Sequence, residues 1–192
     1  EKEHGAKANK WAGLTGKGNR ISRPPPPMRQ TTPAKLAARN SNMAKSTALR
    51  DEIKARFYPF ALERGFVRGK STSLFVPFRR MKGDCVQVFD IQWDKSHRPR
   101  FVINFGEAPA AGVTHWGKHI EATAIDPVHC TVCGRLGRLP GGTMGSWFQI
   151  RKPMVQVFRT LTWSYQPQEV TAQLIARFSD LETWWATRQT GP

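Results

Sequence analysis

Apolar residues recur at three- and four-residue intervals near both ends of one long stretch of the chain, which is the period of an amphipathic α-helix. Residues 44–64 and residues 167–187 are therefore predicted helices, and Gly65 is placed to end the first one. Pro59 falls late in the first segment and predicts a kink or an early end there. The apolar stripes are Leu49, Ile53, Phe57 and Phe60 in the first segment, and Val170, Leu174, Phe178, Leu181 and Trp185 in the second.

Between these segments apolar and polar residues alternate, which is typical of half-buried antiparallel strands. Residues 73–80, 85–93 and 100–105 are predicted strands, and their short, turn-like connections favour a meander. Further strands are expected near 128–139 and 146–150, joined by a turn at 140–142, whereas residues 107–127 show no clear period. The order predicts an α+β fold, an antiparallel sheet of about four to six strands with an N-terminal and a C-terminal helix covering one face.

Residues 1–42 differ from the rest of the chain, because they hold 9 basic and 2 acidic residues, four consecutive prolines and few large apolar residues. Such a segment cannot bury enough apolar area to offset its chain entropy, so we expect a flexible basic segment. Two explanations stay open: a basic arm with a role of its own, or Met43 as the natural start, which we favour because the fold signals begin there. The expected organisation is one domain at 43–188 and a tail at 189–192.

The whole chain has 192 residues, 39% of them hydrophobic, and a formal net charge of +16. This composition excludes a chain that is disordered throughout, and no apolar stretch approaches the roughly 20 residues that a membrane helix needs. Three cysteines cannot form a closed disulfide framework, which favours a reducing compartment. We therefore expect a basic, cytoplasmic protein that does not associate with membranes.

Several short motifs in fixed order give the chain a resemblance to a known family. They are Leu49–Glu52, Gly65–Phe66, Phe78–Arg80, Val102–Gly106, and Cys133–Leu139 followed by Trp147–Phe148. Together they resemble the bacterial domain-of-unknown-function family 4304, over roughly residues 46–188. The family brings no assigned catalytic residues. By analogy of fold, the resemblance implies a small α+β protein of the kind found as partners in toxin–immunity systems.

Four residues have spacing that could suit a structural zinc ion: His115, His119, Cys130 and Cys133. The Cys-x2-Cys pair matches half of a zinc knuckle, and two histidines four residues apart share one face of a helix. The alternative, which we favour, is that this segment binds no metal and has surface histidines and small buried thiols. A redox pair at Cys130 and Cys133 is a weaker hypothesis, because two glycines follow where a helix would be needed.

Arginines and tryptophans are interspersed along the predicted sheet and its turns. A cationic surface with aromatic platforms attracts an acidic protein or nucleic-acid phosphates, although such aromatics more often belong to the core. Trp184 and Trp185 are expected to pin the last helix to the sheet. The candidate binding residues are Arg79, Arg80, Arg98, Arg100, Arg135, Arg138, Trp116 and Trp147.

The motifs of common hydrolases, such as G-x-S-x-G and H-E-x-x-H, are missing from the sequence. We therefore expect a binding protein without catalytic activity or a required cofactor. Its expected partner is an acidic protein such as a toxin domain, which this chain would neutralise in the manner that the resemblance implies. The alternative is a nucleic-acid-binding module, with or without the structural zinc.

Overall fold

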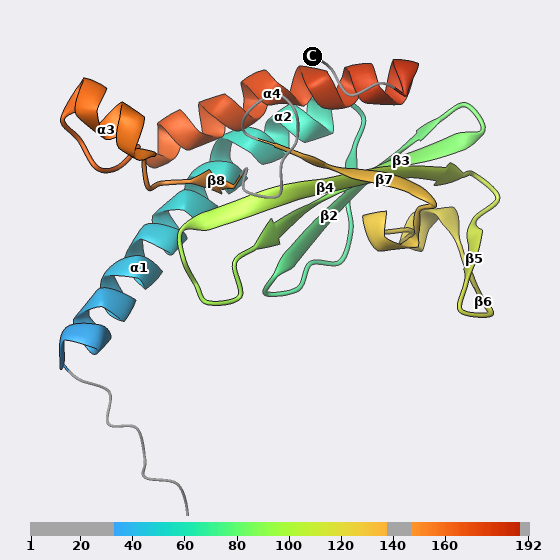
Figure 1. The fold of residues 1–192 in the computed structure, drawn as a ribbon. Helices are drawn as coiled ribbons and strands as arrows, with labels where there is room; N and C mark the ends of the chain where they lie inside the picture. Colours follow the sequence, from blue (N-terminus) through green and yellow to red (C-terminus); the bar gives the residue numbers. More distant parts are fainter. Residues whose placement is uncertain (1–32, 138–146, 189–192) are drawn as a thin grey trace, which may run out of the picture. The chain divides into compact units, whose positions relative to one another are not determined.

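The computed structural model describes residues 33–137 and 147–188, which lie within one compact unit spanning residues 32–192. A first helical run opens this unit (Figure 1). It consists of α1 (Pro33–Glu52), the π-helical turn η1 (Ile53–Phe57) and α2 (Tyr58–Glu63).

The first helical run begins earlier than its apolar stripe predicts. Residues 33–42, which we expected to be flexible, form the first turns of α1. Pro59 does not end the helical run. It lies in the first turn of α2, where its missing N–H is tolerated, and directly follows the wider π-helical turn in which Tyr58 N–H donates to Ile53 O. Gly65 adopts a φ of 80° and ends the run, as predicted.

The main sheet is antiparallel throughout, in the order β1-β2-β3-β4-β7, with β8 also pairing with β4. This confirms the predicted α+β class. Strand β3 has its predicted bounds, and β4 runs four residues past the predicted end. The strands are β1 (Val67–Arg68), β2 (Phe75–Lys82), β3 (Cys85–Trp93), β4 (Arg100–Pro109), β7 (Val132–Leu136) and β8 (Phe148–Gln149).

The stretch 107–127, which has no clear period in the sequence, contains the end of β4, a small hairpin and a short helical turn. The turn predicted at 140–142 lies outside the described residues. The hairpin is β5 (Val113–His115) and β6 (Lys118–Ile120), followed by the 3-10 turns η2 (Ala122–Ala124) and η3 (Pro127–His129).

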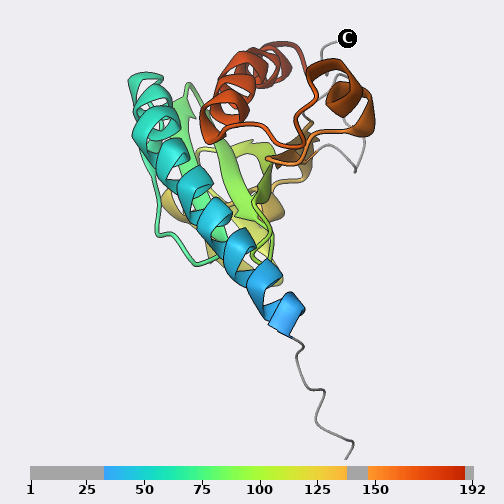
Figure 2. The ribbon, with the colours of Figure 1, turned by 90° about the vertical axis from the view of Figure 1, so that its left-hand side faces the viewer.

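Helix α4 (Pro167–Thr187) has the bounds that its apolar stripe predicts, while α3 (Met154–Thr160) is an element that no pattern predicts. Helices α1, α2 and α4 lie on one face of the sheet (Figures 1 and 2). The core between them is rich in aromatic rings, among them Phe57, Phe78, Phe89 and Phe178. Both Trp184 and Trp185 are buried there, and Trp185 Nε1 donates to Gly106 O at 3.0 Å, which confirms that they pin α4 to the sheet.

A second, smaller apolar cluster lies on the other face of the sheet. There Ile125 and Cys130 pack on Val86, Val88 and Ala108, so the segment around η3 covers part of this face. We call the side of the sheet away from α4 the open face. No helix of the described part is both long and apolar enough to cross a bilayer.

Candidate binding sites

Between β8 and α4 the chain leaves the sheet, forms α3 and returns beside its point of departure. Arg151 and Ser164 form an antiparallel bridge, Tyr165 N–H donates to Ile150 O at 2.7 Å, and Lys152 N–H donates to Trp163 O at 3.1 Å. These contacts make a neck, and α3 stands beyond it, past the end of β8 (Figure 1). We call residues 150–165 the α3 lobe.

A buried lysine holds the α3 lobe together from within. Lys152 is only 8% exposed, and its ammonium donates to Thr160 Oγ1 at 3.0 Å and to Thr162 Oγ1 at 2.6 Å. Its Nζ also lies 5.0 Å from the centre of the Tyr165 ring. A buried ammonium is stable only when its hydrogen-bonding capacity is met, so these contacts fix how the neck and the end of α3 sit relative to each other.

The α3 lobe exposes several large apolar side chains. Five large apolar side chains within ten residues are between 51% and 86% exposed, a density that soluble proteins usually reserve for contact with another molecule. Arg151 and Arg159, in the same lobe, are also exposed. We call the five side chains the apolar patch: Met154, Val155, Phe158, Leu161 and Trp163.

The open face of the sheet contains a cavity of about 700 Å³. Strand register places Pro77, Asp90, Asn104 and Arg135 side by side in one row across β2, β3, β4 and β7, and all four line the cavity. We call it the open-face cavity. Its further lining includes Lys70, Phe75, Gln92, Asp126 and Val128.

Hydrogen bonds fix the polar floor of the open-face cavity. Asn104 Nδ2 donates to Asp90 Oδ1 at 2.8 Å and to Gln92 Oε1 at 2.9 Å, while Asn104 Oδ1 accepts from Arg135 Nε at 3.0 Å. Both amide hydrogens of Asn104 and its oxygen are therefore used within the protein. This side chain acts as a rigid spacer between the carboxyl group of Asp90 and the guanidinium of Arg135.

Asp90 is 6% exposed, and burial raises the pKa of its carboxyl from 3.8 to about 6. The hydrogen bond from Asn104 and the charge of Arg135 lower the pKa, and the charge of Asp126 raises it, but burial has the largest effect. A carboxyl group with a raised pKa at the floor of a cavity is typical of a functional site.

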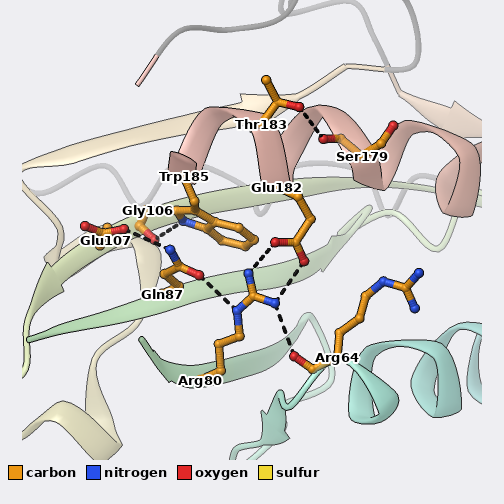
Figure 3. A network of polar contacts seen from close by, with 9 residues as sticks. All are labelled: Arg64, Arg80, Gln87, Gly106, Glu107, Ser179, Glu182, Thr183 and Trp185. Atoms are coloured by element: carbon orange, nitrogen blue, oxygen red, sulfur yellow. Dashed lines mark hydrogen bonds and ion pairs between the residues drawn. The ribbon is translucent and has the colours of Figure 1, made fainter. Parts of the chain in front are cut away.

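Most of the predicted binding arginines lie within ion pairs of the fold. Arg80 lies on the helix side of the sheet and forms a two-pronged contact with Glu182 of α4, one bond of which is 2.9 Å (Figure 3). It also donates to Gln87 Oε1 at 2.9 Å and to Arg64 O at 3.1 Å. The side chain of Arg80 is 11% exposed, so its geometry gives it a structural role in fastening α4 to the sheet.

Carboxylates also bind three further arginines of the predicted binding set. Arg79 contacts Asp126 at 2.6 Å, and Arg98 and Arg100 both contact the buried carboxylate of Asp94. Trp147 lies beneath the guanidinium of Arg100, 4.3 Å from ring centre to Cζ. Of the remaining candidates, Arg135 lines the open-face cavity and Arg138 lies outside the described residues.

Trp116 is 94% exposed in the turn of the β5–β6 hairpin, with a φ of 49° and its ring 4.7 Å from that of His115. In Figure 1 this hairpin and β8, which follows Trp147, lie at opposite ends of the sheet. The two tryptophans proposed from the sequence therefore do not share one surface.

The two candidate histidines lie on different strands, His115 on β5 and His119 on β6, so they do not share one face of a helix. His115 lies against His129, with ring centres 5.2 Å apart, and His119 Nε2 lies 3.5 Å from a carboxylate oxygen of Glu121. Among the described residues, no three or more His, Cys, Asp or Glu side chains are arranged to hold a metal ion. A structural zinc stays a prediction, which metal analysis of the purified chain tests.

The two cysteines of this set differ in exposure. Cys133 is exposed on β7, whereas Cys130 is buried, and burial together with the nearby Cys133 raises the pKa of the Cys130 thiol to about 12. A redox pair needs a thiolate stabilised near neutral pH, so this environment favours a structural role for Cys130.

Sequence patterns missed the α3 lobe and the open-face cavity. The signal for the cavity was present, because Asp90 and Gln92 alternate with Phe89, Ile91 and Trp93 along one strand and so must face away from the core. The α3 lobe gives no comparable signal, apart from several apolar residues without a period after Pro153.

A protein-family model matches residues 57–156, about half of the chain. The matched range begins at the end of η1, includes β1 to β8 and ends within α3, so it contains the open-face cavity and leaves α4 outside. Comparison with curated proteins and with solved structures found no match. The chain belongs to the family described as Domain of unknown function (DUF4304).

Proposed function

We propose that the chain is a binding protein without catalytic activity, and that it captures an acidic protein partner through the α3 lobe. The apolar patch is the observation that carries this proposal. Burying five large apolar side chains would stabilise a complex by about 1.5–3 kcal/mol for each side chain that becomes fully enclosed, before the costs of association are subtracted. A protein surface is the partner that can enclose a convex, projecting element of this kind.

The charge of the chain supports an acidic partner. The sequence carries 30 basic and 14 acidic residues, and several of those carboxylates are already occupied by arginines of the same fold. Arg151 and Arg159 are exposed in the same lobe as the apolar patch, and within the described part neither has an ion-pair partner. Carboxylates around an apolar contact region on the partner would complement this arrangement and speed the encounter.

The internal contacts of the α3 lobe support the same proposal. A surface that is ordered before binding loses less conformational entropy when a complex forms. The neck and the Lys152 ammonium hold the lobe in one arrangement without using any residue of the apolar patch for its side chain. The partner that the family resemblance favours is a toxin domain, and a gene beside that of this chain is where we would look first.

Affinity capture from the organism that encodes the chain tests this proposal, with three baits. Wild-type protein should retain an acidic protein, Phe158→Ser should lose it, and Leu62→Ser should keep it. Leu62 is a matched control because it is an exposed apolar helical residue, 52% exposed against 75% for Phe158, and lies outside the α3 lobe. Equal capture by the wild type and the Phe158→Ser bait would contradict the proposal.

Nucleic-acid binding is the second candidate, and the net charge of +16 is the observation that favours it. Under this hypothesis the chain should capture RNA or DNA. The capture should weaken steeply as the salt concentration rises and should be unchanged by Phe158→Ser. The same three baits therefore separate the two functions.

A further inference from the structure

The open-face cavity is lined by a carboxyl group, that of Asp90, and a guanidinium cation, that of Arg135, which form no ion pair with each other. Asp90 is 6% exposed, and within the described residues it forms no ion pair. Its Oδ1 accepts a hydrogen bond from a neutral amide, that of Asn104. Burying a carboxylate without a cationic partner costs free energy, so its place at the floor of a cavity calls for a ligand that supplies the missing positive charge.

The guanidinium of Arg135 lies on the far side of the same amide. Nitrogen and oxygen of a carboxamide are about 2.3 Å apart. With hydrogen bonds of 2.8 and 3.0 Å on its two sides, Asn104 keeps Asp90 Oδ1 and Arg135 Nε at most about 8 Å apart. The strand register agrees, because β3 and β7 flank β4 and stand two strand spacings apart, which is about 10 Å between backbones.

This spacing selects for a ligand with both charges. An ammonium nitrogen and a carboxylate oxygen on one carbon are about 3 Å apart, and two further hydrogen bonds of about 2.8 Å give a span of about 8 to 9 Å. Both values are for fully extended geometry, and Asn104 keeps the two protein groups within about 8 Å, so a ligand of this length reaches both groups. A simple anion would be repelled by Asp90. A simple cation would be repelled by Arg135 and by Lys70, which also lines the cavity.

We propose that the open-face cavity binds a free α-amino acid with an apolar side chain. Its ammonium group lies at Asp90, its carboxylate lies at Arg135, and its side chain packs against Phe75 and Pro77. The cavity of about 700 Å³ falls in the range of small-molecule sites and leaves room for a large side chain. This site is separate from the α3 lobe and does not depend on the proposed function.

Calorimetric titration of the full chain at neutral pH tests the proposal, with L-leucine, L-methionine and L-phenylalanine as the probes. At least one should bind with a dissociation constant below about 1 mM. For leucine, the analogue without the carboxylate, 3-methylbutylamine, and the analogue without the amine, 4-methylpentanoate, should each bind at least about tenfold more weakly, since each leaves one charged group unpaired.

Two variants and two matched controls locate the site. Asp90→Asn and Arg135→Gln should each weaken binding about tenfold or more, whereas Asp84→Asn and Arg56→Gln, which change the same charges at exposed positions elsewhere, should leave binding unchanged. Thermal unfolding of every variant confirms that it is folded. The proposal is overturned if none of the three amino acids binds up to about 10 mM, if the two analogues bind as well as leucine, or if folded Asp90→Asn binds as the wild type does.

Discussion

Asp90 destabilises the folded chain at neutral pH, and replacing it with asparagine should therefore stabilise the protein. The substitution keeps the shape of the side chain and an oxygen that accepts from Asn104 Nδ2, so the hydrogen-bonded floor of the open-face cavity stays intact. The substitution removes the negative charge of the carboxylate, which is unfavourable in a buried position. The folded pKa of about 6 against the ordinary 3.8 corresponds to a cost of about 3 kcal/mol for the fully ionised group.

The sign follows from proton linkage. Between pH 4 and pH 6 the folded state binds more protons at Asp90 than the unfolded state does, because the folded pKa is the higher one. The stability that Asp90 contributes is fully present below its unfolded pKa and is lost as pH rises through its folded pKa. The advantage of Asp90→Asn should thus grow by about 2 kcal/mol between pH 4.5 and pH 7.5.

Urea unfolding of the wild type and Asp90→Asn at several pH values measures this difference, since the two proteins differ in this one side chain. Asp84→Asn, at an exposed turn position, is the control and should show no such trend. An advantage that stays constant between pH 4.5 and 7.5, or a loss of stability at pH 7.5, would refute the argument that burial of this charge raises its pKa. If Asp90→Asn is more stable than the wild type and also binds the amino acid more weakly, then the wild type has a binding residue that lowers its stability.

Three further substitutions test contacts of the fold by urea or thermal unfolding. Trp185→Phe leaves Gly106 O without its indole donor and should cost about 1–2 kcal/mol, and an unchanged stability would mean that water replaces the bond. Gly134→Ala places a methyl carbon 2.6 Å from Phe105 Cζ and should cost about 1–3 kcal/mol, whereas a neutral result would show that the ring moves freely. Leu161→Asn should stabilise by about 0.5–1 kcal/mol, because Leu161 has a φ of 52° and is 86% exposed, and a destabilised variant would count against strain there.

Periodicity located the elements whose burial is regular. Helix α4 and strand β3 have their predicted bounds because each places every apolar residue of its stripe against the same core. The start of α1 could not be found in this way, since residues 33–42 continue the helix without continuing the stripe. That segment is rich in alanine and basic residues, which favour helix through backbone propensity alone.

The candidate sites depend on contacts that no local pattern contains. Arg80 pairs with Glu182, which lies 102 residues later in the chain, and Arg79 pairs with Asp126, so residues that looked like a free cationic surface are neutralised within the fold. The open-face cavity likewise requires the register of four strands to bring Asp90 and Arg135 into one row. Sequence could place both residues on strands but could not place them together.

The neck of the α3 lobe separates the proposed binding surface from the sheet and α4. Because the bridge between Arg151 and Ser164 brings the two ends of the excursion together, we expect changes of length or sequence between Lys152 and Thr160 to leave the strands and α4 in place. For an engineer, the same bridge marks the position at which a foreign recognition loop can be inserted.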